Sequence, residues 1–217
     1  MSSRSAARAD RRTRARETEE ALVTACGEGN FNDVKALLES GANADSVAGT
    51  GYTALHAACA GGHADIASRL LRKGAEINRP VRGCHTPLYI ACQEGHALIV
   101  ALLLRRDGID VNRANVYGAT PLYIACQKGC REVVKLLLRH DSIDVNRARE
   151  DGARPLCIAC CKGHHEVVEL LLRHDSIDVN WAREDGATPL YAACSVGDRE
   201  AVELLLRHGG IDVNQAC

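Results

Sequence analysis

Residues 118–146 read GATPLYIACQKGCREVVKLLLRHDSIDVN, and variants of this stretch recur along the chain. The residues equivalent to its Thr120 are Thr53, Thr86, Arg154 and Thr188, at successive offsets of 33, 34, 34 and 34 residues. A fixed period in this range indicates a solenoid, in which each copy buries its apolar side only against neighbouring copies. Length alone is then a poor guide to the number of domains, because such a chain grows by copying.

The short words TPLY, AC, GxxEVV, LLL and IDVN occur in the same order within the copies. This order resembles the ankyrin repeat family, whose unit runs TPLH, AA, GHxxVV, LL and GAxVN. The resemblance extends over about residues 17–217 and rests on several words at fixed offsets. It implies an all-α solenoid of stacked helix-turn-helix units joined by β-turn fingers. It also implies a non-enzymatic scaffold that binds other proteins, without naming the partner.

Aligned in this way, the chain divides into a tail and about six repeats. The boundaries are 1–16 for a basic tail, 17–47 for a degenerate first repeat, then 48–80, 81–114, 115–148, 149–182 and 183–217. The first repeat lacks the TPL word and carries Glu17, Glu19 and Glu20 on its first helix, which suits the polar outer face of a capping repeat. In the last repeat, polar residues do not replace the apolar positions of the second helix, residues 200–206. We therefore expect an apolar end that supports self-association, is covered by a partner, or continues into a longer array.

Composition narrows the class of protein. Hydrophobic residues make up 46% of the chain but aromatic residues only 3%, so the core must consist of aliphatic, Ala and Cys side chains. The net charge of −1 argues against nucleic-acid binding by the whole body. No apolar run approaches the roughly 18–20 residues of a membrane span. We expect a protein of the cytoplasm, or of the nucleus.

Six of the eleven cysteines occupy the second position of the AC word, one in each repeat. These residues, here called the cysteine row, are Cys26, Cys59, Cys92, Cys126, Cys160 and Cys194. Packed helices lie about 8–10 Å apart, whereas a disulfide needs Cα atoms closer than about 7 Å. The row therefore predicts small buried thiols in a reducing compartment rather than disulfides.

Each repeat word has a mechanical role. The Thr predicts an N-cap and the following Pro the first helical residue. Gly62, Gly95, Gly129, Gly163 and Gly197 predict left-handed helix ends. The leucine of the TPL word is expected in the core, at Leu55, Leu88, Leu122, Leu156 and Leu190.

Several copies depart from the pattern. Arg154 replaces the capping Thr, which should cost the fifth repeat about 1 kcal/mol. Gly83 comes one residue early in its finger and Cys84 takes the usual glycine place, so we expect a distorted turn there. One residue is inserted after the second helix in each of the four later copies, and the loop is expected to bulge. Tyr or Cys replaces the last His of the TPLH word at 89, 123, 157 and 191, which puts the family's histidine hydrogen bonds in doubt.

The tail carries Arg4, Arg8, Arg11, Arg12, Arg14 and Arg16 against one acid, Asp10. It has too little apolar surface to collapse, and we expect disorder or a frayed helix. Three interpretations stay open: a nuclear-import or nucleic-acid-contacting arm, a transit peptide, and a solvated charged extension.

One stretch has the composition of a metal site. Cys157, Cys160, Cys161, His164 and His165 could supply zinc ligands, or make the protein redox-responsive. However, Cys160 belongs to the cysteine row and His164 to the GH word, so their repeat positions already explain them. No phosphate loop, GxSxG or HExxH motif is present, and no nucleophile, base and orienting group converge. We expect no cofactor, no metal and no catalysis.

In the family, partners lie against the concave face that is formed by the fingers and the first helices. The matching finger positions are Arg79, Arg82, His85, Arg113, Asn115, Tyr117, Arg147, Arg149, Trp181 and Arg183, and the first-helix positions are Gln93, Glu94, Gln127, Lys128 and Lys162. Arg, Tyr and Trp dominate interface energies, and the arginines favour an acidic peptide or protein surface. Alternatively, the arginines balance neighbouring acids and Trp181 packs on the next repeat.

Overall fold

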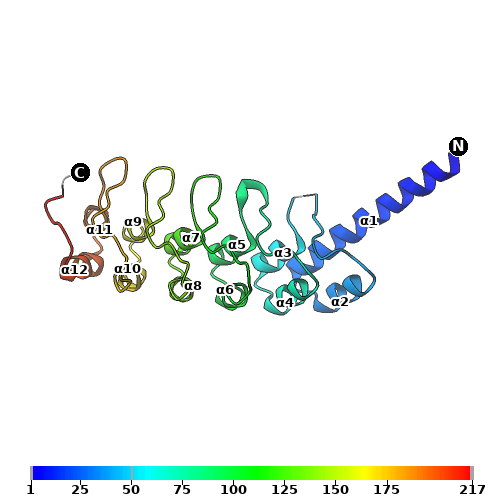
Figure 1. Ribbon diagram of the computed structural model, residues 1–217, viewed down its shortest axis with the longest axis horizontal. Helices are drawn as coiled ribbons and strands as arrows, with labels where there is room; N and C mark the ends of the chain where they lie inside the picture. Colours follow the sequence, from blue (N-terminus) through cyan, green and yellow to red (C-terminus); the bar gives the residue numbers. More distant parts are fainter. Residues whose placement is uncertain (1, 50, 216–217) are drawn as a thin grey trace.

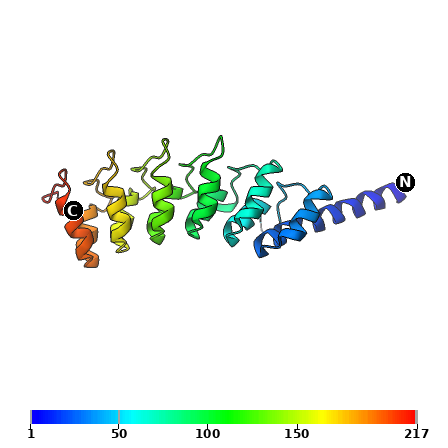
Figure 2. The same ribbon diagram turned by 90° about the horizontal axis from the view of Figure 1, so that it is seen from below.

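The computed structural model describes residues 2–49 and 51–215, with side chains from residue 13 onward. Its helices are arranged as antiparallel pairs that stack into one elongated row (Figures 1 and 2). The first helices of the pairs are α1 (Ser2–Glu28), α3 (Ala54–Gly61), α5 (Pro87–Gln93), α7 (Pro121–Lys128), α9 (Pro155–Cys161) and α11 (Pro189–Val196). The second helices are α2 (Phe31–Glu39), α4 (Ala64–Arg72), α6 (Ala97–Leu104), α8 (Arg131–Leu137), α10 (His165–Leu172) and α12 (Arg199–Arg207). The expected all-α solenoid of six helix pairs is confirmed.

The repeat words begin and end the first helices as expected. Thr53, Thr86, Thr120 and Thr188 each accept a hydrogen bond from the backbone N–H three residues later, and Pro opens α5, α7, α9 and α11. The predicted glycines at the helix ends all have positive φ, between 68° and 80°. Arg154 makes no such cap at α9. Since local hydrogen bonding determines these ends, the repeat words predict them without tertiary information.

The core runs the length of the stack between successive pairs, as a one-dimensional architecture requires. Leu55, Leu88, Leu122 and Leu156 are buried, while Leu190 of the last pair is only half-buried. The cysteine row follows the same rule, since it is buried from Cys26 to Cys160 and exposed at Cys194. All described cysteines are free thiols. Burial raises the pKa of the Cys26 thiol to about 12, so these side chains behave as small apolar residues.

The two ends of the row differ from its middle. Residues 2–16, expected to be disordered or a frayed helix, form the first half of α1, which projects beyond the stack (Figure 1). The arginines before residue 13 lie outside the residues whose side chains the structure describes. At the other end, Tyr191, Val196, Leu206 and Val213 are exposed, in agreement with the expected apolar end.

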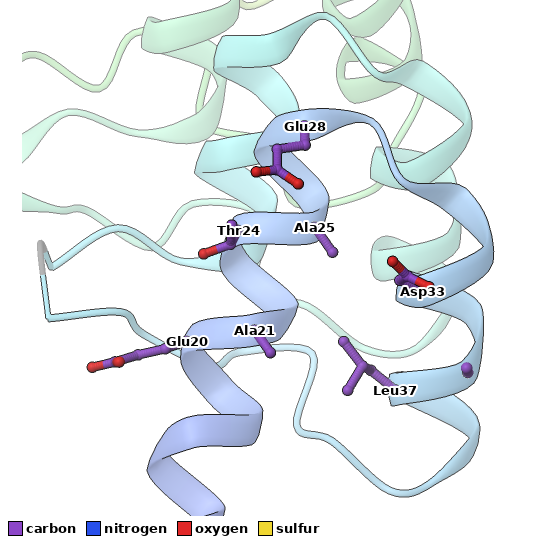
Figure 3. A pocket seen from close by; sticks show the side chains of 8 residues that line it. Glu20, Ala21, Thr24, Ala25, Glu28, Asp33 and Leu37 are labelled. Carbon is purple, nitrogen blue, oxygen red and sulfur yellow. The ribbon is translucent and has the colours of Figure 1, made fainter.

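A groove of about 530 Å³ lies between α1 and α2, at the N-terminal end of the stack. Ala21 and Ala25 of α1 face Leu37 of α2 across the groove, and the acids Glu28 and Asp33 lie toward one end of it (Figure 3). The acids Glu17, Glu19 and Glu20, proposed as a polar cap, lie on the same helix and are exposed or half-buried.

Candidate functional site

The fingers that join the repeats form a regular row. In the finger before α7, the Asn115 N–H donates to Ala119 O at 2.9 Å and Gly118 N–H donates back to Asn115 O at 3.0 Å. The equivalent bonds close the fingers before α9 and α11. Gly118 has a φ of 77°, which side chains rarely adopt, and a Cβ there would meet the next finger at the backbone N of Glu150. Glycine is therefore required both by the turn and by close packing of the row.

Adjacent fingers are also connected through their backbones. Val116 N–H donates to Gly83 O at 3.0 Å, and Glu150 N–H donates to Tyr117 O at 3.2 Å. Glu184 N–H donates to Asp151 O at 3.4 Å one finger further on. These bonds hold the fingers at fixed spacing, so their side chains are presented by a preorganised surface.

The finger before α5 is distorted, as expected from its shifted glycine. Residues Arg82–Cys84 form a short 3₁₀ turn in which Gly83 has a φ of 77° and Cys84 a φ of 59°. Among the described residues, Cys84 is the one non-glycine with positive φ. The turn thus places two consecutive residues in the left-handed region.

A set of asparagines at the finger bases was missed by sequence reasoning. We call Asn78, Asn112, Asn146 and Asn180 the asparagine ladder. Each side-chain amide donates at 2.6–2.7 Å to a carbonyl thirty residues later, and each side-chain oxygen accepts a backbone N–H thirty-two residues later at 2.8–3.0 Å. Asn112, Asn146 and Asn180 are the Asn of the IDVN word and Asn78 ends the corresponding AEIN, so their recurrence was the signal in the sequence.

The loops that contain the inserted residues form the other side of this ladder. The carbonyls that receive the asparagine amides belong to Gly108, Ser142, Ser176 and Gly210, within the expected bulges. Ser142 and Ser176 also donate their backbone N–H groups at 3.3 Å to Nδ1 of the histidine two residues earlier. Each of these loops therefore provides an acceptor for the preceding repeat.

The predicted binding residues divide into two groups by exposure. Arg82, Glu94, Arg113, Tyr117, Lys128, Arg147, Lys162 and Trp181 are exposed, and Arg79, His85, Gln93, Asn115, Gln127, Arg149 and Arg183 are half-buried. The half-buried group is engaged in local contacts. His85 stacks on Tyr89 at 4.6 Å between ring centroids, and Asn115 Nδ2 donates to Tyr89 Oη at 3.2 Å. Gln93 Nε2 donates to Glu94 Oε1 at 2.8 Å.

The finger arginines are not equivalent. Arg149 pairs with Asp151 and Arg183 with Asp185, each at 3.2 Å within its own finger. Arg149 also lies over the Tyr123 ring, 5.6 Å from its centroid. Arg113 and Arg147 form no ion pair with any described residue. Arg82, which is also exposed, likewise forms no ion pair with any described residue, so three exposed finger guanidiniums lack an acidic partner.

Trp181 is attached to the preceding finger and to the start of α9, and part of its ring remains accessible. Its indole Nε1 donates to Gly152 O at 3.1 Å, and the Arg154 guanidinium stacks on its ring at 3.7 Å. Arg154 in turn pairs with Asp178 at 2.7 Å. Trp181 nevertheless remains 41% exposed, which leaves a fixed aromatic anchor on the finger row.

The residues considered as zinc ligands do not come together. The Cys157 and Cys161 thiols are hydrogen-bonded on α9, which lowers the pKa of the Cys161 thiol with help from the nearby Arg183 charge. His164 Nε2 donates to Gln127 O at 3.2 Å, and His165 lies instead beside Asp198. In the described part of the chain, no nucleophile, base and orienting group share a pocket.

Within residues 2–49 and 51–215, no helix is both long and apolar enough to cross a membrane.

Comparisons with known proteins agree with this geometry. The chain matches the model of "Ankyrin repeats (3 copies)" three times, over residues 5–81, 79–149 and 142–217. It is similar to the crystal structure of EF0377, an ankyrin repeat protein, with a TM-score of 0.80 and 28% identity. The similarity covers 87% of this chain and 97% of that one. No curated protein matches the sequence. Because the family model spans nearly the whole chain and the stacked pairs, fingers and caps follow its pattern, this chain belongs to the ankyrin repeat family.

Proposed function

We propose that the protein is a scaffold that holds a partner protein or peptide against its fingers and first helices. Ankyrin repeats are in general protein-interaction modules and are typically non-enzymatic. The observation that carries the proposal is the row of exposed side chains on a preorganised backbone, with Arg113 and Arg147 unpaired among the described residues. Such a row binds with little rearrangement.

The chemistry of the row favours an acidic partner. The guanidiniums of Arg113 and Arg147 offer forked donors that match carboxylates, and Tyr117 and Trp181 supply aromatic contact area. A partner in the cytoplasm or nucleus is part of the proposal, because the cysteine row would remain reduced there.

The test begins with affinity capture and mass spectrometry, followed by affinity measurements on the captured partner. Replacing Arg147 or Trp181 with Ala should weaken binding by about 1–4 kcal/mol each. The matched control is Arg139→Ala, because Arg139 is also exposed but follows α8, the second helix of its pair. Arg147→Ala should also leave the melting temperature nearly unchanged. Equal affinity of wild type, Arg147→Ala and Arg139→Ala would refute this binding face.

A second candidate function rests on α1. Its N-terminal half contains all six tail arginines and projects beyond the stack, where an extended polyanion could reach it (Figure 1). In this alternative the protein is a nuclear or nucleic-acid-associated regulator. Binding to DNA or RNA with steep salt dependence, lost when residues 1–16 are deleted, would support it. If the protein does not bind DNA or RNA, or if this binding is independent of salt, the alternative is excluded and only the scaffold proposal stands.

A further inference from the structure

At three junctions between repeats, the residue that precedes the second helix fastens the repeat to the preceding one. This residue is a histidine. His63 Nε2 donates to Gly27 O at 3.1 Å, His96 Nε2 to Ala60 O at 3.0 Å, and His164 Nε2 to Gln127 O at 3.2 Å. The equivalent residues elsewhere are Cys130 and, before α12, Asp198. An ionised carboxylate cannot donate a hydrogen bond, so the last junction lacks this fastener.

Asp198 is a buried carboxylate with unused binding capacity. Its side chain is only 6% exposed. Oδ1 accepts the Ala201 N–H at 3.1 Å and so caps α12, while Oδ2 has no hydrogen-bond partner among the described residues. Burying a carboxylate oxygen without a partner is costly, which points to a missing ligand.

Two further ligating side chains lie beside it. His165 opens α10 in the preceding repeat, and Glu200 lies in the first turn of α12. One potential ligand atom from each of His165, Asp198 and Glu200 lies within 4.8 Å of the others, and His165 Nδ1 is 3.9 Å from Asp198 Oδ1. The residue equivalent to His165 is Arg131 in the fourth repeat and Ala97 in the third. Within the described chain, this His–Asp–Glu grouping is the one such cluster found.

We propose that His165, Asp198 and Glu200 bind a divalent transition-metal cation of the zinc type, which joins the last two repeats. One imidazole nitrogen and two carboxylate oxygens suit Zn²⁺, with water in the remaining position. Bonds of about 2.0–2.2 Å would place the ligand atoms roughly 3.4 Å apart. The His165–Asp198 separation of 3.9 Å is larger, but His165 and Glu200 are both exposed, so rotation of their side chains can shorten it.

The cation would do at this junction what a histidine does at three of the others. It would connect α10 of one repeat to α12 of the next and compensate the buried Asp198 charge. Because a ligand that binds only the folded state stabilises it, Zn²⁺ should protect the last repeat in particular.

The test is calorimetric titration of the untagged, reduced full chain with ZnCl₂. We expect one saturable site, at least tenfold weaker in His165→Ala and Glu200→Gln. The matched control is Glu166→Gln, since Glu166 is the equivalent of Glu200 one repeat earlier. Asp198→Asn offers a further variant, because Asn preserves a capping side chain but removes the charge. Zn²⁺ should raise the melting temperature of the wild type and of Glu166→Gln but not of Glu200→Gln.

A second measurement separates this site from the thiols. Bound Co²⁺ should give visible absorption without the charge-transfer bands of thiolate ligation. Thiolate bands that disappear in Cys161→Ser would assign the cation to Cys157 and Cys161 and overturn the proposal. Unchanged affinity in both His165→Ala and Glu200→Gln, tighter binding of Mg²⁺ or Ca²⁺ than of Zn²⁺, or no saturable Zn²⁺ binding would also overturn it.

Discussion

His56 is the residue at which the family's histidine hydrogen bonds survive. Its side chain is fully buried, and Nε2 donates to His85 O at 3.2 Å. Nδ1 then accepts a hydrogen bond from Thr53 Oγ1 at 2.6 Å, which requires a neutral ring. Burial is the main reason that the pKa of His56 is lowered to about 4. The tyrosines at the equivalent positions 89 and 123 are also buried, but they do not titrate in this range.

This environment predicts a pH-dependent stability. In the unfolded chain His56 takes up a proton near pH 6.5, whereas the folded protein keeps it neutral down to about pH 4. The unfolded state therefore binds more protons between these values, and stability falls as the pH falls through this window. The contribution is at most about 3 kcal/mol.

Replacing His56 with Tyr, as the chain does at position 89, should remove this part of the pH dependence. The measurement is urea unfolding of both proteins at several pH values. Carboxylates titrate in both proteins, so the contribution of His56 is the difference between the two curves of unfolding free energy against pH. Parallel curves from pH 7 to pH 4 would contradict the assignment.

Cys161 should be the most reactive thiol of α9. The hydrogen bond from Cys157 and the charge of Arg183 lower its pKa, and the side chain is half-buried rather than closed off. Because the thiolate is the nucleophile, alkylation near pH 7 should favour Cys161 over Cys157 and Cys160. Mass spectrometry after brief iodoacetamide treatment measures this. Arg183→Gln should slow the labelling, and an unchanged rate would exclude the arginine as a cause.

At the scale of the element, the asparagine ladder holds each loop to the next. Every member of the ladder both donates and accepts across a repeat boundary. Asn146→Ala removes two such bonds, one to Ser176 O and one from Asp178 N–H. The Ser176 carbonyl and the Asp178 N–H must then form hydrogen bonds with water instead. The unfolding free energy should fall by about 1–3 kcal/mol.

Asn214 provides the matched control for this prediction. It occupies the ladder position of the last repeat, and among the described residues its side chain bridges to no later loop. Asn214→Ala should therefore change stability by less than about 0.5 kcal/mol. Equal destabilisation by Asn146→Ala and Asn214→Ala would show that the inter-repeat bonds contribute nothing.

At the scale of the whole molecule, stability should decrease toward the C-terminal end. Each repeat is stabilised by its neighbours, and the last described repeat has a neighbour on one side. Leu190 and Cys194 are accordingly more exposed than their equivalents in the middle of the stack. Amide hydrogen exchange should be fastest in α11 and α12 and slowest in α5 to α8. Uniform protection along the row would contradict this gradient.

Self-association is one of the three outcomes expected for the apolar end, and it can be tested directly. Tyr191 and Val196 on α11 are exposed beside the half-buried Leu190. Substituting Val196 with Lys should shift a concentration-dependent oligomer toward monomer in light scattering. A matched Leu98→Lys change, at an exposed apolar residue of α6, should have no such effect. A monodisperse wild-type monomer at high concentration would exclude self-association.

The sequence by itself determined the local features of this protein. Caps, helix ends, the cysteine row and the number of helix pairs could be predicted because each depends on residues within one repeat or on a fixed period. Even the distorted turn at Gly83 and Cys84 followed from a shift of one glycine.

The tertiary structure decided what depends on distances between residues far apart in the sequence. The dual role of the asparagines, the engagement of Arg154 by Asp178 and Trp181, and the meeting of His165 with Asp198 and Glu200 all join residues 24–35 positions apart. The sequence names these residues, but only stacking brings their polar atoms within bonding distance. Stacking also places the Arg149 guanidinium over the Tyr123 ring of the preceding repeat, whereas its ion pair with Asp151 forms within its own finger.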